Sequence, residues 1–213
     1  QEKNANRRYT TSCSVGVGRQ IIFEDDDDRR FFPELLRKHL CDTSPSSLLA
    51  WCLMSNHTHL LIHRELSALS KAMRLIGVSY ARCFNDRYNR AGHLFQDRFA
   101  SEPIKGDSQL MATIRNIHNN PVKANAAKVD EYEWSSYQDR LDEERESLLD
   151  RGYVIELFGS RSGFVRFHEA DDGGEHHLDI PTKHCHAFKL TEPEALDVAE
   201  DVLGAGRIGS LKE

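Results

Sequence analysis

The chain has 213 residues and a formal net charge of −6, with 39% hydrophobic and 29% charged residues. This composition is typical of a globular protein and excludes a fibrous or fully disordered chain. No run approaches the roughly 18 apolar residues that a membrane span requires, and no apolar core follows the N-terminus as in a signal peptide. The five cysteines include no C-x-x-C pair, which argues against a zinc ribbon and a disulfide framework. We therefore expect a cytoplasmic protein that has no membrane partner.

Charge is distributed unevenly along the chain. Residues 1–140 hold 20 Lys and Arg against 17 Asp and Glu, whereas residues 141–213 hold 8 against 17. An acidic C-terminal part therefore offsets a mildly basic body. We expect a functional domain at 1–140 and an acidic, mainly helical extension at 141–213.

The segment from Lys71 to Lys105 combines basic and aromatic residues. It has seven basic residues against three acidic ones, and five Tyr or Phe residues lie among them. Such a segment can contact phosphates and stack on nucleic-acid bases. A solvated helix face with aromatic residues in the core explains the same pattern, so both interpretations stay open.

The first half of the chain predicts strands around one helix. Thr, Ser and Val over 9–17 predict a strand and a turn. The acidic run at 25–28 favours the start of a helix that extends to about residue 41, because carboxylates stabilise a helix N-terminus. These carboxylates can also imitate a metal site, but capping is the simpler interpretation. Two apolar runs, 48–54 and 57–63, flank a Ser-Asn break and predict antiparallel strands.

The second half is mainly helical. Residues 67–86 form an amphipathic pattern, and 92–104 predict a small hairpin or irregular connection. A helix at 110–120 ends before Pro121, which then begins a short helix over 122–129. Further helices are expected at 151–170 and 191–203. This order predicts an α+β fold of ferredoxin-like type, an antiparallel sheet with helices on one face.

The sharpest local feature is the His57-Thr58-His59 sequence inside an apolar strand. Residues i and i+2 of a strand point to the same face, so both imidazoles project together. Such a pair can hold a divalent metal or orient a phosphate. The chain has eleven histidines, so an incidental pair is the alternative.

The residues around this pair carry a resemblance to a known family. Residues 53–62, Leu-Met-Ser-Asn-His-Thr-His-Leu-Leu-Ile, resemble the Met-Pro-Asn-His-x-His-Leu-Leu signature of HUH single-tyrosine transposases. Within these enzymes the chain is most similar to the insertion-sequence-200-like group and its REP-associated tyrosine transposases. The likeness continues in collinear blocks at 16–20, 22–25, 80–85, 92–99, 117–124 and 132–137.

The resemblance implies a metal-dependent reaction on DNA. Members cut single-stranded DNA with a tyrosine that attacks a backbone phosphate and forms a 5′-phosphotyrosine link. In this sequence His57, His59 and Asn120 match the ligands of Mg²⁺ or Mn²⁺, an ion that offsets charge in the transition state. For Asn120, an N-cap of the helix that Pro121 begins is an alternative of equal weight.

The nucleophile is where the sequence departs from the family. The family has Arg-Tyr-Ile-His, whereas residues 115–118 are Arg-Asn-Ile-His, so Asn116 occupies the position of the catalytic tyrosine. A carboxamide cannot form the phosphotyrosine link. The simplest interpretation is a scaffold and metal face that persist while the cleavage chemistry is impaired.

The resemblance also suggests which residues contact DNA. They are all basic and lie in or near the segment that grips hairpins in the family: Arg82, Arg87, Arg90, Arg98, Lys105 and Arg115. Solvated or ion-paired surface arginines are the alternative.

Three functions follow from these patterns. The first is a transposase-family protein, monomeric or homodimeric, that acts on single-stranded or hairpin DNA in transposition. The second is a non-catalytic DNA-binding regulator or domesticated remnant of such an enzyme. The third is a ferredoxin-like interaction module with no nucleic-acid role.

Overall fold

The computed structural model describes residues 9–41, 47–96, 100–104, 106–142, 144, 147–149 and 151–170. The helix predicted at 191–203 lies outside these residues. In the part of the chain that is described, no helix is long and apolar enough to cross a membrane.

A four-stranded antiparallel sheet forms the centre of the fold. Its strands are β1 (Tyr9–Val15), β2 (Ser47–Met54), β3 (His57–His63) and β4 (Ala100–Ile104), in the order β2-β3-β1-β4. With α1 after β1 and α2 after β3, the chain has the β-α-β-β-α-β order of a ferredoxin-like fold. The predicted α+β class and the strand pair around the 55–56 turn are confirmed. Strand β4 lies where the sequence predicted a hairpin or an irregular connection.

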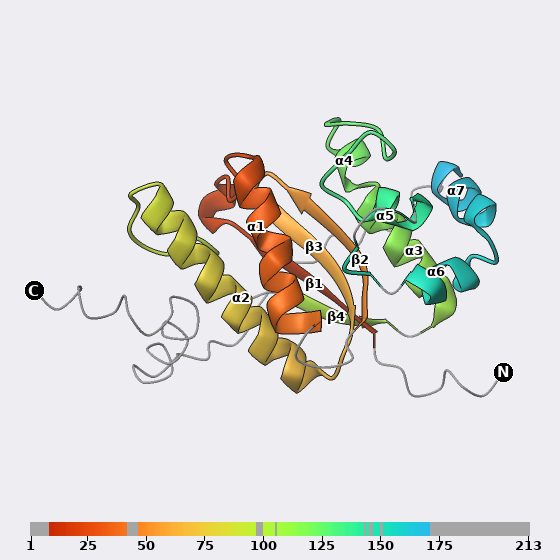
Figure 1. Ribbon diagram of the computed structural model, residues 1–213, viewed down its shortest axis with the longest axis horizontal. Helices are drawn as coiled ribbons and strands as arrows, with labels where there is room; N and C mark the ends of the chain where they lie inside the picture. Colours follow the sequence, from red (N-terminus) through yellow and green to blue (C-terminus); the bar gives the residue numbers. More distant parts are fainter. Residues whose placement is uncertain are drawn as a thin grey trace, which may run out of the picture.

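Two helices cover the first face of the sheet (Figure 1). They are α1 (Asp26–Leu36), which continues into a π-helical turn η2 (Arg37–Cys41), and α2 (Leu66–Arg87). Their apolar sides pack on Leu60 and Ile62 of β3 through a core rich in aromatic residues. A short 3₁₀ turn, η1 (Val17–Arg19), links β1 to this layer.

The later helices cover the opposite face of the sheet (Figure 1). They are α3 (Asp107–His118), α4 (Asn120–Lys123), α5 (Tyr137–Leu141), α6 (Arg151–Leu157) and α7 (Arg161–Glu169). The expected placement of helices on one face therefore holds for α1 and α2 only. The reason is visible in β2, where all seven residues from Leu48 to Met54 are buried. A strand without a polar face must be covered on both sides.

Helices α6 and α7 belong to the core of this second face. Val154, Phe158 and Phe164 are buried in the same cluster as Leu61 of β3 and Ile114 of α3. Apolar burial of this kind anchors the helices to the sheet. The boundary after residue 140 stays a prediction, but the helical part of 151–170 contributes directly to the core.

A chain of hydrogen bonds joins β2, α3 and α7 inside this layer. His118 Nε2 lies 2.8 Å from Ser136 Oγ, and His118 Nδ1 lies 2.9 Å from His168 Nε2. His168 Nδ1 is 2.8 Å from the carbonyl oxygen of Phe164. That oxygen can only accept, so His168 donates to it and accepts from His118, which in turn accepts from the Ser136 hydroxyl. The Trp51 amide of β2 donates to Ser136 Oγ. These hydrogen bonds fix α3 against β2 and α7.

Candidate nucleic-acid interface

The two histidines of the H-x-H sequence project from the same face of β3. Their ring centroids are 4.9 Å apart and their planes are perpendicular. They share the face of Leu61, which packs in the cluster of α3. His57 Nδ1 lies 2.6 Å from the side-chain oxygen of Asn56, so His57 donates there and its Nε2 faces away.

Both imidazoles are neutral near pH 7. Burial lowers the pKa of His57, with a contribution from the charge of Arg19. Burial also lowers the pKa of His59 to about 3, assisted by His57 and by the charge of Lys123. A neutral ring can coordinate a metal through its unprotonated nitrogen, which in His57 is Nε2, because Nδ1–H donates to Asn56. Burial is the main cause of both shifts, and the charges of Arg19 and Lys123 contribute less.

The end of α3 and the short helix α4 carry Asn116, Asn120 and Lys123. Lys123 Nζ donates to Asn116 Oδ1 over 3.2 Å, and Asn116 is buried. Asn120 Nδ2 donates to the backbone oxygens of Asn116 and Ile117 at the end of α3. The N-cap of α4 is Asn119, which makes no side-chain cap. The N-cap interpretation of Asn120 is therefore wrong, because its amide satisfies carbonyls of the preceding helix instead.

The groups at this face offer a divalent cation only neutral donors. The expected donors are two imidazoles and one carboxamide, none of which is negatively charged, while Lys123 and Arg19 bring positive charge. Mg²⁺ prefers oxygen ligands and Mn²⁺ accepts imidazole more readily, so an ion held here would take its negative charge from a phosphate of bound DNA. Among the described residues no group of three or more His, Cys, Asp or Glu side chains could hold a metal. Binding of Mg²⁺ or Mn²⁺ by His57, His59 and Asn120 stays a prediction.

Arg19 is held above the turn between β2 and β3. Its backbone has a positive φ of 60°, and its carbonyl accepts a hydrogen bond of 3.3 Å from Asn56 Nδ2. The same Asn56 side chain contacts His57. Next to Arg19, Gln20 accepts a 2.6 Å hydrogen bond from Arg90, whose guanidinium lies over the Phe84 ring. A neutral amide leaves the charge of Arg90 uncompensated.

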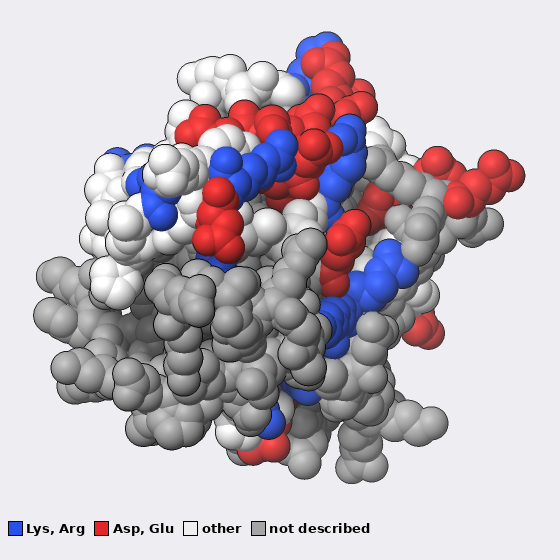
Figure 2. Space-filling model, turned by 60° about the vertical axis from the view of Figure 1, so that its left-hand side comes forward, with Lys and Arg blue, Asp and Glu red and all other residues white. Residues whose placement is uncertain are grey.

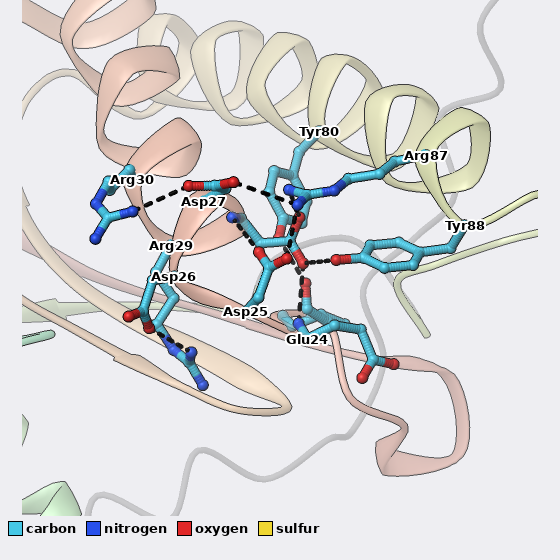
Figure 3. Close-up of polar contacts among 11 residues, drawn as sticks. Glu24, Asp25, Asp26, Asp27, Arg29, Arg30, Tyr80, Arg87 and Tyr88 are labelled. Atoms are coloured by element: carbon cyan, nitrogen blue, oxygen red, sulfur yellow. Dashed lines mark hydrogen bonds and ion pairs between the residues drawn. The ribbon is translucent and has the colours of Figure 1, made fainter.

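The two arginines of α2 that the sequence predicted as DNA contacts, Arg82 and Arg87, are paired with acids. Arg82 Nε lies 3.9 Å from Asp86. Arg87 forms ion pairs of 2.6 Å with Asp25 and 3.1 Å with Asp28 (Figure 3). On the face shown in Figure 2, Lys and Arg side chains accordingly lie among Asp and Glu side chains over the described surface. Arg98 and Lys105 lie outside the described residues.

The acidic run at 25–28 has the structural role that its position predicts. Asp25 caps α1 by accepting from the Asp28 amide over 3.1 Å. The buried Asp28 carboxylate accepts from Arg87, from the Tyr88 hydroxyl at 2.9 Å and from the Glu24 amide at 2.9 Å (Figure 3). The run therefore joins the start of α1 to the end of α2, and the capping interpretation is confirmed.

Arg115 lies between α3 and α7. It is buried, its guanidinium carbon is 4.7 Å from the centre of the Phe167 ring, and it donates to the Phe167 carbonyl over 3.4 Å. This packing stabilises the docking of α7 through a cation–π contact. A DNA contact by Arg115 stays a prediction, and it requires α7 to move.

The tyrosines of the matched region have other partners. The hydroxyls of Tyr80 and Tyr132 donate to the carbonyls of Ile22 and Leu53, and the Tyr88 hydroxyl bonds to Asp28. Burial raises the pKa of Tyr80, and it raises the pKa of Tyr132 to about 12. These phenols are structural and are poor sources of phenolate.

Comparisons with known proteins agree with this arrangement. The family model described as "Transposase IS200 like" matches residues 15–120. The chain belongs to the IS200-like transposase family. A solved structure described as "Structure of the REP associates tyrosine transposase bound to a REP hairpin" has the same fold, with a TM-score of 0.50 and 17% sequence identity. The likeness covers 63% of this chain and 79% of that one. No curated protein matches this IS200-like chain.

Sequence reasoning missed the cations beside the histidines. Lys123 follows Asn120 by three positions, and residues i and i+3 lie on the same helix face, so its place beside a predicted ligand was readable. Arg19 lies in one of the matched blocks, at 16–20, but nothing in its spacing connects it to His57. The link through Asn56 depends on how β1 and β3 pair in the sheet.

Proposed function

We propose that this member of the IS200-like transposase family binds single-stranded or hairpin DNA at the surface around His57 and His59 without forming a covalent intermediate. One observation carries the proposal. Asn116 occupies the position of the family's tyrosine and is buried. Its side-chain oxygen accepts a hydrogen bond from Lys123. A carboxamide has no ionisable oxygen that attacks a phosphate.

Three basic side chains without carboxylate partners support a DNA partner. Arg19, Arg90 and Lys123 have no carboxylate within ion-pair distance among the described residues, unlike Arg82 and Arg87. Unpaired cations release counterions when they bind phosphates, which drives nucleic-acid association. The similar structure contains a REP hairpin by its description, and we extend that class of ligand to this chain.

Strand cleavage by a different tyrosine is the competing function. It requires a phenol near the histidine pair, but the hydroxyls of Tyr80, Tyr88 and Tyr132 bond to groups in the first layer or to β2. Tyr137 is buried among His118, Phe164 and His168, and burial raises its pKa. A DNA-binding regulator or domesticated remnant is therefore the favoured form of the proposal.

The test compares binding with covalent chemistry. Fluorescence anisotropy with a labelled hairpin that has single-stranded flanks should show tighter binding than a duplex of equal length, and affinity should fall as KCl rises. A denaturing gel of the same mixture with Mn²⁺ should show no protein–DNA adduct. Equal affinity for the duplex would overturn the hairpin preference. An adduct that maps to a tyrosine would overturn the non-covalent assignment.

A further inference from the structure

Asn56, in the turn between β2 and β3, bonds to two different groups through its side-chain amide. Its Nδ2 donates to the Arg19 carbonyl over 3.3 Å, and its Oδ1 lies 2.6 Å from His57 Nδ1. The Arg19 carbonyl can only accept, so the amide nitrogen must face Arg19 and the amide oxygen must face His57. An amide turned the other way would place its oxygen against the Arg19 carbonyl. The Arg19 backbone therefore decides how the Asn56 amide is oriented.

The orientation of Asn56 in turn decides which nitrogen of His57 carries the proton. Asn56 Oδ1 has no hydrogen to donate, so the 2.6 Å contact is a hydrogen bond only when His57 Nδ1 is the donor. A neutral imidazole has a single N–H, and Nε2 is then left with its lone pair. This nitrogen can bind a cation, but it has no proton to donate to a phosphate oxygen.

The backbone around Asn56 is fixed by the segment that follows β1. The Gly16 amide donates to the Asn56 carbonyl over 3.0 Å, and the Ile22 amide donates to the Ser55 carbonyl over 2.8 Å. Arg19 has a positive φ of 60°, a conformation that is costly in a residue other than glycine and that persists where neighbouring contacts impose it. The acceptor for His57 is therefore in place before any ligand binds.

The unprotonated nitrogen belongs to a ring on the same strand face as His59. The two ring centroids are 4.9 Å apart. Histidines that bind metal usually donate their second ring N–H to a carboxylate, a carbonyl or water, which fixes the tautomer and the ring orientation. The side-chain carbonyl of Asn56 is such an acceptor. Two neutral imidazoles on one face, one with its proton held on the far nitrogen, fit Mn²⁺, which accepts nitrogen ligands more readily than Mg²⁺.

We propose that the Arg19 carbonyl and Asn56 form a positioning relay that holds His57 in the Nδ1–H form and presents its Nε2 lone pair to a divalent cation. Asn56 is a positioning residue, since it acts through His57. The inference goes beyond the proposed DNA-binding function and concerns the protein without DNA.

The first experiment determines the tautomer of His57 in the full chain without metal or DNA. Long-range ¹H–¹⁵N correlation spectra at pH 8 distinguish protonated from unprotonated ring nitrogens. His57 should have a protonated Nδ1 and an unprotonated Nε2. In Asn56→Ala the Nδ1 proton loses its acceptor, so the Nε2–H form should become the major one. Asn56→Asp keeps an acceptor for His57 and loses only the donor to Arg19, so it should keep the Nδ1–H form.

Two further variants control for indirect effects on the tautomer. Asn85→Ala is the matched control, because Asn85 also donates to a loop carbonyl, that of Gly92, over 2.9 Å. Arg19→Gly removes the charge but favours the same positive φ. Both should leave the tautomer unchanged. An Nε2–H ring in the unmodified protein, an Nδ1–H ring in Asn56→Ala, or an Nε2–H ring in Asn56→Asp would overturn the relay.

The second experiment titrates Mn²⁺ alone and follows the His57 and His59 ring signals, which a bound paramagnetic ion broadens. The concentration for half-maximal broadening should be roughly tenfold higher in Asn56→Ala than in the unmodified chain, because loss of the acceptor of a ligating histidine weakens metal binding. Asn85→Ala should match the unmodified chain. Signals that stay sharp in the unmodified protein, or that broaden equally in Asn56→Ala, would overturn the inference. Neither measurement contains DNA, so the proposed function stands or falls separately on the hairpin titration.

Discussion

The two faces of the sheet differ in where their polar groups lie. Under α1 and α2 the core is apolar and aromatic, and the charges of Asp25, Asp28 and Arg87 gather at the rim, where they neutralise one another. Under α3, α6 and α7 the layer encloses His118, His168 and Ser136 as a hydrogen-bonded chain. The histidine pair opens on this second side. The acidic run at 25–28 therefore has a structural role at the first face. On the second face, neutral polar groups surround the candidate site at His57 and His59.

The largest expected effect tests the rim of the first face. Asp28→Ala leaves Arg87, Tyr88 and the Glu24 amide without their shared acceptor, so the free energy of unfolding should fall by about 2–4 kcal/mol. Urea denaturation measures this loss, and hairpin affinity per folded molecule should not change. The control is Asp26→Ala, since Asp26 is exposed and forms only a surface pair with Arg29, which contributes less than about 1 kcal/mol. A loss of DNA affinity in folded Asp28→Ala would contradict the division between the two faces.

A pH series tests the buried chain of the second face. Burial lowers the pKa of His168 to about 4, whereas the unfolded residue titrates near 6.5. Below pH 6.5 the unfolded chain therefore binds a proton that the folded chain does not, and stability falls as pH drops towards 4. Between pH 7 and 5 this residue should account for about 2 kcal/mol of lost stability.

The corresponding variant is His168→Gln, which keeps an acceptor for His118. Its unfolding free energy should be lower at pH 7 by about 1–2 kcal/mol and should depend less on pH than that of the unmodified protein. Parallel pH profiles for the two proteins would show that His168 is not neutral and buried in solution.

A smaller effect separates Arg82 of α2 from Arg90, which follows the end of that helix. Arg90→Ala should weaken hairpin binding roughly threefold, because its charge has only the neutral Gln20 as a partner. Arg82→Ala should change the affinity less, since Asp86 already offsets its charge. Anisotropy titrations at one salt concentration rank the two variants. The reverse order would show that ion pairing with Asp86 does not limit the contribution of Arg82 to DNA binding.

The smallest effect concerns the missing nucleophile. Asn116→Tyr introduces a phenol but removes the acceptor of Lys123, so we expect at most a trace of covalent adduct with Mn²⁺ on a denaturing gel. A phenol misplaced by about 1 Å reacts far more slowly than one that is well placed. An abundant adduct would show that position 116 still places a phenol well for attack on DNA.

Local signals predicted most of the first layer. The acidic run placed the start of α1 within one residue, and the alternation around Ser55-Asn56 predicted β2 and β3. The period of two put His57 and His59 on one face, as the structure has them. These features depend on residues that are close together in the sequence. They can therefore be predicted before the fold is known.

The features that sequence reasoning missed are long-range. Strand β4 is short and contains a proline, so only its pairing with β1 defines it. The contact between His118 and His168 joins residues fifty positions apart, and Arg19 reaches His57 only through the sheet. No local period encodes such pairings.

The bond between His118 and His168 also sets an order of assembly. During synthesis α3 leaves the ribosome long before α7, and until α7 arrives the Nδ1 of His118 has water as its partner. The β-α-β-β-α-β unit that ends with β4 can fold by then. Helix α3, which carries Asn116, still lacks the contacts that α7 provides. The nascent protein is therefore expected to complete the proposed nucleic-acid site as one of its last folding events, when residues 161–169 dock.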